Sequence, residues 1–173
     1  MRRKNFYLVE VDVYNVGIGL SKNAVSRAKD WLIQNNSPAL SELVLSQNDA
    51  KNDDAKAAAV LKFVRNVTKQ QFVDAFDDVF KDCNREGYLN LKNAIGSSIG
   101  DNIKTGDEIT FYWVGTDKII VYMNGVKGGS VSDASVARRL LDIYVDPSMT
   151  VSKELVHSLD QNTAKLAISD LLM

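Results

Sequence analysis

Two β-type runs flank a short glycine-containing turn in "DEITFYWVGTDKIIVYMNG", residues 107–125. Both runs are rich in β-branched and aromatic residues, and the turn falls at Gly115–Asp117. This pattern predicts a β-hairpin over 107–124. Because the strands of a hairpin are antiparallel, the sheet that contains them is not wholly parallel. No glycine-rich turn between a strand and a helix supports a doubly wound sheet either.

Three further segments have strand character. Residues 6–20, "FYLVEVDVYNVGIGL", alternate so that Tyr14 points away from Val9, Val11 and Val13, and therefore faces either solvent or a cleft. Residues 58–67 form a second β-type run, and "VKGGSV" after Gly125 indicates a short third strand or an edge. The polar stretch 46–58 is interpreted as a loop that leads into the second run.

Helical patterns lie between these strands. Ser21 is expected to cap a helix over 22–36, and Thr68, with Gln71 three residues later, forms a capping box that opens a helix from about 68 to 85. That helix has an apolar stripe and is expected to end at Gly87. A short helix follows over 88–100, Ser132 is expected to cap another over 133–145, and the last begins after Thr150. The apolar stripe comprises Phe72, Ala75, Phe76, Val79 and Phe80.

The predicted order is strand, helix, strand, two helices, hairpin, short strand and two helices. This order, with its antiparallel pair, predicts an α+β fold in which helices pack on one face of an antiparallel sheet. The length of 173 residues favours a single domain over 1–173.

Composition argues against several classes of function. The net charge of −1 gives no indication of nucleic acid or an anionic membrane as a partner, and no run of about 18 apolar residues predicts a membrane span. No signal peptide is evident, although a removed leader is compatible with the start of the chain. His157 is the only histidine and Cys83 the only cysteine, so we expect neither a multi-histidine metal site nor an intramolecular disulfide. Nucleotide-binding and nucleophile-elbow motifs are not found, and no metal or cofactor is expected.

The stretch 138–159, "RRLLDIYVDPSMTVSKELVHSL", predicts two helices that meet at a corner around Pro147. The overlapping stretch "ASVARRLLDIYVDPSMTVSKEL", residues 134–155, resembles part of the chalcone isomerase-like superfamily together with three other stretches, because all four occur in that family's order. The other three are "VYNVGIGL", "VLKFVRNVTKQQFVDAFDDVF" and "GDEITFYW". The resemblance covers most of residues 6–160. It implies an open-faced β-sandwich with a ligand cleft between sheet and helices.

The start of the chain departs from the family pattern. The family has a hairpin's length of chain before this point, ending in a glycine-rich turn and an arginine, whereas this sequence begins at the arginine. Either a leading segment has been removed or the sheet lacks the family's first strands.

The family includes plant chalcone isomerases and non-catalytic fatty-acid binders. The isomerases share a set of catalytic residues. The set is an arginine, a threonine on a strand, a tyrosine and an asparagine on a helix, and a serine or threonine on the penultimate helix. These groups stabilise a phenolate and an enolate. The fatty-acid binders keep the arginine and have a tyrosine in place of the strand threonine, and this pair holds the carboxylate.

The resemblance implies a role for seven residues. Arg2, or Arg3 after a slip of one residue, falls at the arginine, and Tyr14 falls where fatty-acid binders have tyrosine. The isomerase tyrosine, asparagine and serine or threonine are replaced by Phe72, Val79 and Ala137, and Phe76 lies between the first two on the helix stripe. The family's catalytic set is therefore not present, and we expect a small apolar or carboxylated ligand to bind at Arg2, Arg3, Tyr14, Phe72, Phe76, Val79 and Ala137.

Residue types alone support a plainer interpretation. Phe72 and Val79 are typical core residues of an amphipathic helix, and arginines near a chain end are usually solvated. Three classes of function stay open: a fatty-acid or lipid carrier, an isomerase for another substrate, and an interaction protein without a small ligand. The sequence leaves the natural ligand, the compartment and the oligomeric state open.

Overall fold

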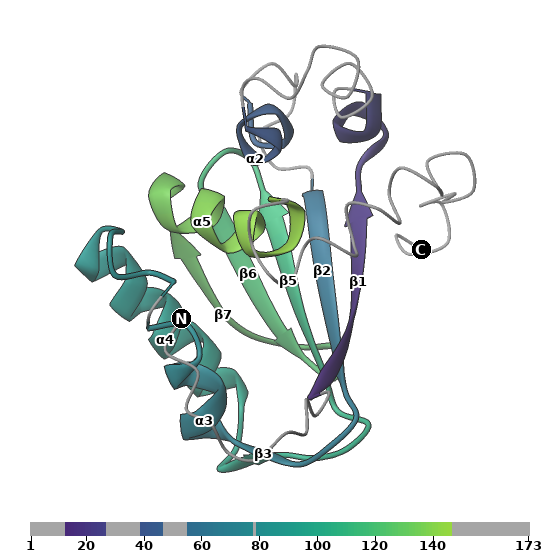
Figure 1. Cartoon of the computed structure of the whole chain (residues 1–173), viewed down its shortest axis with the longest axis vertical. Coiled ribbons are helices and arrows are strands. Elements are labelled where there is room, and N and C mark those ends of the chain that lie inside the picture. Colours follow the sequence, from purple (N-terminus) through teal and green to yellow (C-terminus); the bar gives the residue numbers. More distant parts are fainter. Residues whose placement is uncertain (1–12, 27–38, 47–54, 78, 147–173) are drawn as a thin grey trace, which may run out of the picture.

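The computed structural model describes residues 13–26, 39–46, 55–77 and 79–146 (Figure 1). Its main element is a five-stranded antiparallel sheet in the order β1-β2-β5-β6-β7. The strands are β1 (Tyr14–Leu20), β2 (Ala55–Phe63), β5 (Glu108–Val114), β6 (Lys118–Met123) and β7 (Val126–Ser132). A separate two-stranded pair joins β3 (Val67–Thr68) to β4 (Asn102–Ile103).

Four helices have both ends among the described residues, and their bounds are α2 (Leu40–Val44), α3 (Lys69–Asp74), α4 (Arg85–Ser98) and α5 (Ala134–Val145). Residues 22–26 are also helical, and the Ser21 hydroxyl accepts a hydrogen bond from the Ala24 amide at 3.2 Å, as a helix cap does. In Figure 1, α5 lies across the sheet and α4 runs beside β7. Among the residues that the structure describes, no helix has the length and apolar character to cross a membrane.

The helices cover one face of the sheet, which we call the inner face. Its side chains come from alternate positions of the strands because successive residues of a strand point to opposite sides. They are Tyr14, Val16, Ile18, Leu20, Ala57, Ala59, Leu61, Phe63, Ile109, Phe111, Trp113, Ile119, Val121 and Val131. Most of them are fully buried, so the predicted α+β fold, with helices on one face of an antiparallel sheet, is confirmed.

The predicted hairpin is confirmed as β5 and β6, with Gly115 at a φ of 63° in its turn. The next turn, at Asn124 and Gly125, also has positive φ angles, of 49° and 78°. Two such residues in a row form the tight turn that suits the twist of a hairpin. β7 is thereby placed at the edge of the sheet, as "VKGGSV" predicts.

Two strand boundaries differ from the prediction. β2 spans Ala55–Phe63, so the interpretation of 46–58 as a loop was wrong for its last four residues, and 58–67 was too long at its far end. Alanine is a weak strand former, but β2 pairs with β1 on one side and β5 on the other, and this pairing outweighs propensity. β1 begins at Tyr14, and residues 6–12 of the first predicted strand lie outside the described residues.

The helix predicted from 68 to 85 is wrong in length. The capping box of Thr68 and Gln71 is present as expected, but α3 ends at Asp74 and turns follow. Asn84 then caps α4, accepting a hydrogen bond from the Glu86 amide at 3.1 Å. Phe76 and Phe80 still reach the core, because the turns after α3 keep them facing the sheet.

Two cap assignments also differ. Gly87 does not end a helix but lies in the first turn of α4, where the Asp133 side chain packs so close that a Cβ would collide with it. The residue that caps α5 is Asp133 rather than Ser132, since its carboxylate accepts from the amides of Ser135 and Val136 at 2.9 and 3.0 Å. The short helix predicted over 88–100 and the one over 133–145 are confirmed as α4 and α5. The helix predicted after Thr150 lies outside the described residues.

Candidate functional site

Predicted site residues meet on the inner face as a row of aromatic rings. Tyr14 on β1 pairs in register with Phe63 on β2, and their ring centroids are 5.7 Å apart in an edge-to-face arrangement. Phe63 contacts Phe72 of α3 at 5.4 Å, and Phe72 contacts Phe76 at 5.3 Å. Such edge-to-face pairs are favourable in themselves. The row therefore joins the edge of the sheet to the segment that follows α3.

The open question about Tyr14 is answered by its surroundings. The side chain faces the inner side with Val16 and Ile18, not the solvent, and it packs against the core cluster. Burial raises the pKa of the Tyr14 phenol above its ordinary value. At neutral pH this hydroxyl is therefore a protonated hydrogen-bond donor on the helix-covered side of the sheet.

The capping box explains how Phe72 reaches this place. The Thr68 hydroxyl accepts from the Gln71 amide at 3.2 Å, and the Gln71 side chain accepts from the Thr68 amide at 3.0 Å. This reciprocal pair fixes the first turn of α3 directly after β3. The next residue, Phe72, is thereby turned onto the sheet, where it is 4% exposed.

Val79 and Ala137 belong to two segments of the helix layer that a hydrogen bond joins. Val79 is half-buried, and its carbonyl accepts a hydrogen bond from Arg139 Nε at 2.9 Å, so α5 is tied to the turns after α3. Ala137 is fully buried on α5, and its carbonyl accepts from the Trp113 indole at 2.8 Å. Neither position holds a polar side chain, as the sequence indicates.

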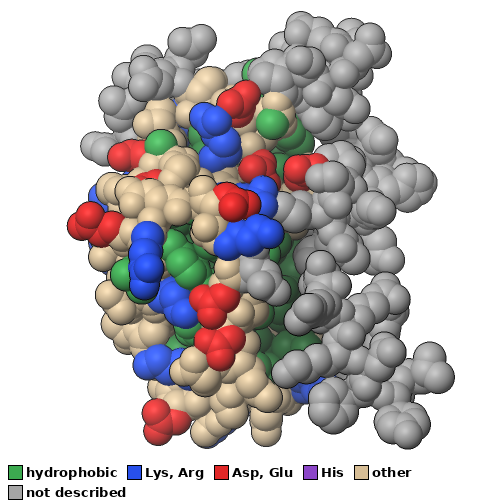
Figure 2. All heavy atoms as spheres, turned by 60° about the vertical axis from the view of Figure 1, so that its left-hand side comes forward, with side chains coloured by type: hydrophobic (Ala, Val, Ile, Leu, Met, Phe, Trp, Pro, Cys, Tyr) green, Lys and Arg blue, Asp and Glu red, His purple; other side chains and the backbone are tan. Residues whose placement is uncertain are grey.

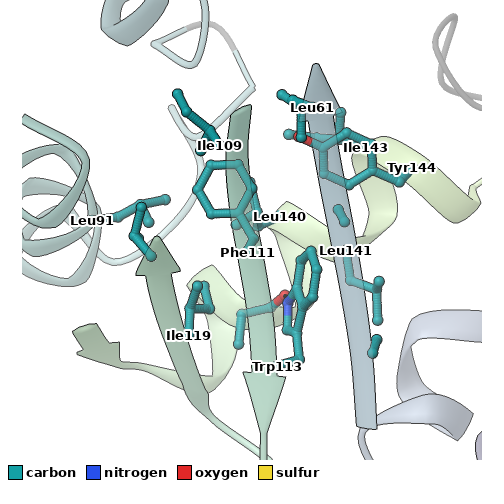
Figure 3. Packing of buried hydrophobic residues seen from close by; sticks show 14 of the residues in the cluster. Leu61, Leu91, Ile109, Phe111, Trp113, Ile119, Leu140, Leu141, Ile143 and Tyr144 are labelled. Atoms are coloured by element: carbon teal, nitrogen blue, oxygen red, sulfur yellow. Dashed lines mark hydrogen bonds between the residues drawn. The ribbon is translucent and has the colours of Figure 1, made fainter. Parts of the chain in front are cut away.

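Tyr144 is a residue that the sequence interpretation did not place in the site. It lies on α5, is 1% exposed, and packs edge-to-face on Trp113 with ring centroids 6.4 Å apart. Figure 3 shows its ring extending from α5 over β2 beside Leu61. Burial, and to a smaller degree the nearby Tyr14, raises the pKa of Tyr144 well above its usual range. The "LLDIYV" run contained this signal, because an amphipathic helix that buries a tyrosine must also place its hydroxyl.

Arg2 and Arg3, the expected carboxylate partners, lie outside the described residues. So does His157. Within the described ranges, no group of three histidine, cysteine, aspartate or glutamate side chains is arranged to hold a metal ion.

A surface pocket of about 410 Å³ lies away from the aromatic row, between the turn before α4 and the first half of α5. Arg138 on its rim pairs with Glu42 of α2 at 2.6 Å. Figure 2 shows this side of the molecule with basic and acidic side chains interspersed, not gathered into a patch of one sign. Only Ala134 and six polar residues line it: Asp82, Cys83, Ser135, Arg138, Arg139 and Asp142. None of the predicted site residues is among them.

The five-stranded antiparallel sheet, open on one side and covered by helices on the other, defines an open-faced β-sandwich. The chain belongs to the chalcone isomerase-like family, whose model matches residues 40–155. Three of the four stretches that carry the resemblance lie in this range, and "VYNVGIGL" precedes it.

Among solved structures, the chain is similar to a fatty-acid binding protein of Arabidopsis thaliana. The TM-score is 0.66 at 19% sequence identity, and the match covers 94% of this chain and 83% of that one. At this identity the similarity shows a shared fold. A search of curated protein sequences finds no match.

Proposed function

We propose that this protein binds a fatty acid, or a similar apolar carboxylate, along the row of rings between the inner face and the helix layer. The observation that carries the proposal is that apolar side chains replace polar ones at the positions that the family resemblance matches. By the family resemblance, Phe72, Val79 and Ala137 fall where chalcone isomerases have hydroxyl and amide groups, and Tyr14 falls at the head-group position of the fatty-acid binders. The Tyr14 side chain packs against the core on the inner side. An apolar wall with a few convergent donors suits an alkyl chain with a polar end.

The aromatic contacts limit where an alkyl chain can lie. The rings of Phe63, Phe72 and Phe76 touch one another at centroid distances of 5.4 and 5.3 Å, so no chain passes between them as they are placed. We therefore place the chain alongside the row, with its carboxylate towards Tyr14. Each methylene removed from water contributes about 0.8 kcal/mol.

The same exchange argues against chalcone cyclisation. A phenylalanine and a valine donate no hydrogen bond, and the loss of one transition-state donor typically lowers a rate by about 10²–10³-fold. We expect purified protein to convert a hydroxychalcone to flavanone no faster than buffer does. Formation of one flavanone enantiomer in excess would instead favour an isomerase that acts through Tyr14.

The binding test is a titration with a fluorescent fatty acid, followed by its displacement with dodecanoic acid. Val79→Trp should block the chain, whereas Val64→Trp, at a position that is 42% exposed on the surface, should leave binding unchanged. Arg2→Ala and Arg3→Ala test the cationic partner that the family resemblance implies. The proposal fails if the wild type shows no saturable binding, and this result would favour an interaction protein without a small ligand. Equal binding by the wild type and Val79→Trp would indicate that the ligand binds at a place other than this row of rings.

A further inference from the structure

Two tyrosines from distant parts of the sequence converge at one corner of the inner face. Tyr14 begins β1, opposite Phe63 on β2, and the Tyr144 ring lies over β2 beside Leu61. Leu61 and Phe63 are successive inner-face residues of one strand, since they are two positions apart. Tyr14 and Tyr144 therefore approach the same end of β2, one within the sheet and the other from α5.

Neither phenol oxygen has a hydrogen-bond partner within the described part of the chain. Tyr144 as a whole is 1% exposed, but its hydroxyl is not among the fully buried oxygens that lack a partner in the described residues, so the hydroxyl keeps a small accessible area at which a ligand can bond. Apolar rings lie against both tyrosines: the Trp113 ring packs on Tyr144, and the Phe63 ring packs on Tyr14. The corner thus combines two donors with an apolar floor.

We propose that Tyr144 and Tyr14 together hold the head group of the ligand, each donating its hydroxyl proton to one oxygen of a carboxylate. This inference rests on the proposed function and adds to it a specificity-determining residue on α5. An ionised carboxylate has two oxygens and only accepts hydrogen bonds, so two protonated phenols complement it. A tyrosine phenol is ordinarily protonated at neutral pH, which is the state that donates, and burial raises the pKa of both phenols further.

The consequence is selectivity for the acid over neutral analogues of the same chain length. A carboxylate accepts from both phenols, and hydrogen bonds to an ionised group are stronger than those between neutral groups. A methyl ester keeps the alkyl chain but has no charge. Removing one phenol should therefore weaken binding of the acid much more than binding of the ester.

The experiment compares dodecanoic acid with methyl dodecanoate on the full chain, for the wild type, Tyr144→Phe, Tyr14→Phe and the double variant. Tyr112→Phe is the matched control, because Tyr112 lies on the opposite face of the sheet against Tyr122. Tyr144→Phe should raise the Kd for the acid about tenfold or more. It should change the Kd for the ester less than about twofold, and Tyr112→Phe should change neither.

A measurement on the unmodified protein guards against a folding defect in Tyr144→Phe. With tyrosine labelled at the ring Cζ carbon, dodecanoic acid should shift the Tyr14 and Tyr144 resonances and leave that of Tyr112 in place. Unchanged acid binding in Tyr144→Phe, equal losses for acid and ester, or a Tyr144 resonance that does not move would each overturn the inference. If the wild type binds the acid in these cases, the proposed function stands without Tyr144; if it binds neither compound, both proposals fail.

Discussion

The two faces of the central sheet share strands but differ in what they contact. On the inner face Trp113 has no exposed surface and its indole is bonded to α5, whereas its neighbour Tyr112 points to the outer face and is half-buried against Tyr122. The period-2 alternation of a strand produces both environments from adjacent residues. The difference shows that the helix layer, and not strand propensity, determines which residues of the sheet become core.

The largest contrast is expected for Trp113→Ala and Tyr112→Ala. The first removes a fully buried ring and the indole hydrogen bond to the Ala137 carbonyl, so the free energy of unfolding should fall by about 3–5 kcal/mol. The second removes a cross-strand aromatic contact and should lower it by about 1 kcal/mol or less. Urea titration followed by circular dichroism measures both. Losses of equal size would mean that the outer face is covered as completely as the inner one.

A smaller contrast is expected for two glycines on opposite faces. A Cβ at Gly129 of β7 would lie 2.8 Å from the Ala94 Cα of α4, which is closer than folded proteins allow, so the helix must move away. We expect Gly129→Ala to lower the free energy of unfolding by about 1–3 kcal/mol.

Gly17→Ala is the matched change on the outer face of β1, where a Cβ would meet no atom within 4 Å. It should be neutral or stabilising by up to about 1 kcal/mol, because alanine restricts the unfolded chain. Thermal melts of the two variants compare these sites. A neutral Gly129→Ala would mean that α4 is not held firmly against β7.

The elements that the sequence predicted well depend on neighbours close in the chain. The hairpin of β5 and β6 follows from two β-type runs and one turn, and the start of α3 follows from Thr68 and Gln71 three residues apart. The error over 68–85 arose because Phe72, Phe76 and Phe80 have helical spacing. Turns after Asp74 keep the same residues buried. Hydrophobic spacing alone does not distinguish one long helix from a short helix followed by turns.

The rest depended on contacts between distant segments. Gly87 has the appearance of a helix stop, but its role is to admit the Asp133 side chain from 46 positions later in the chain. The sequence places Tyr144 in the stretch that leads to the predicted corner at Pro147. Its proximity to Tyr14 arises only when α5 packs on the sheet. Tyr14, Phe72 and Phe76 could be grouped in advance because the family resemblance supplied the long-range information that the residues lack.

The smallest predicted effect concerns Asp142, a carboxyl in the layer that covers the inner face. Burial raises its pKa, and the nearby Ser41 hydroxyl opposes this, although the pair lacks hydrogen-bond geometry in the structure. Asp146 adds to the rise, while Arg139 and Arg138 reduce it. Because the folded state holds this proton more tightly than the unfolded state, the stability that Asp142 contributes is present below the unfolded pKa and is lost as pH rises through the folded pKa.

Asp142→Asn should therefore raise the melting temperature slightly at pH 7 and flatten the fall in stability between about pH 4 and pH 7. The gain in stability should be smaller than the losses expected for Trp113→Ala and Gly129→Ala, because only part of one carboxyl group is desolvated. Melting curves at several pH values measure it, with Asp101→Asn, an exposed carboxyl beside α3, as the control. A variant that is less stable than wild type at pH 7 would show that the ionised carboxylate supports the contact between α2 and α5. The helix layer would then be held by charge as well as by the apolar contacts that bury the inner face.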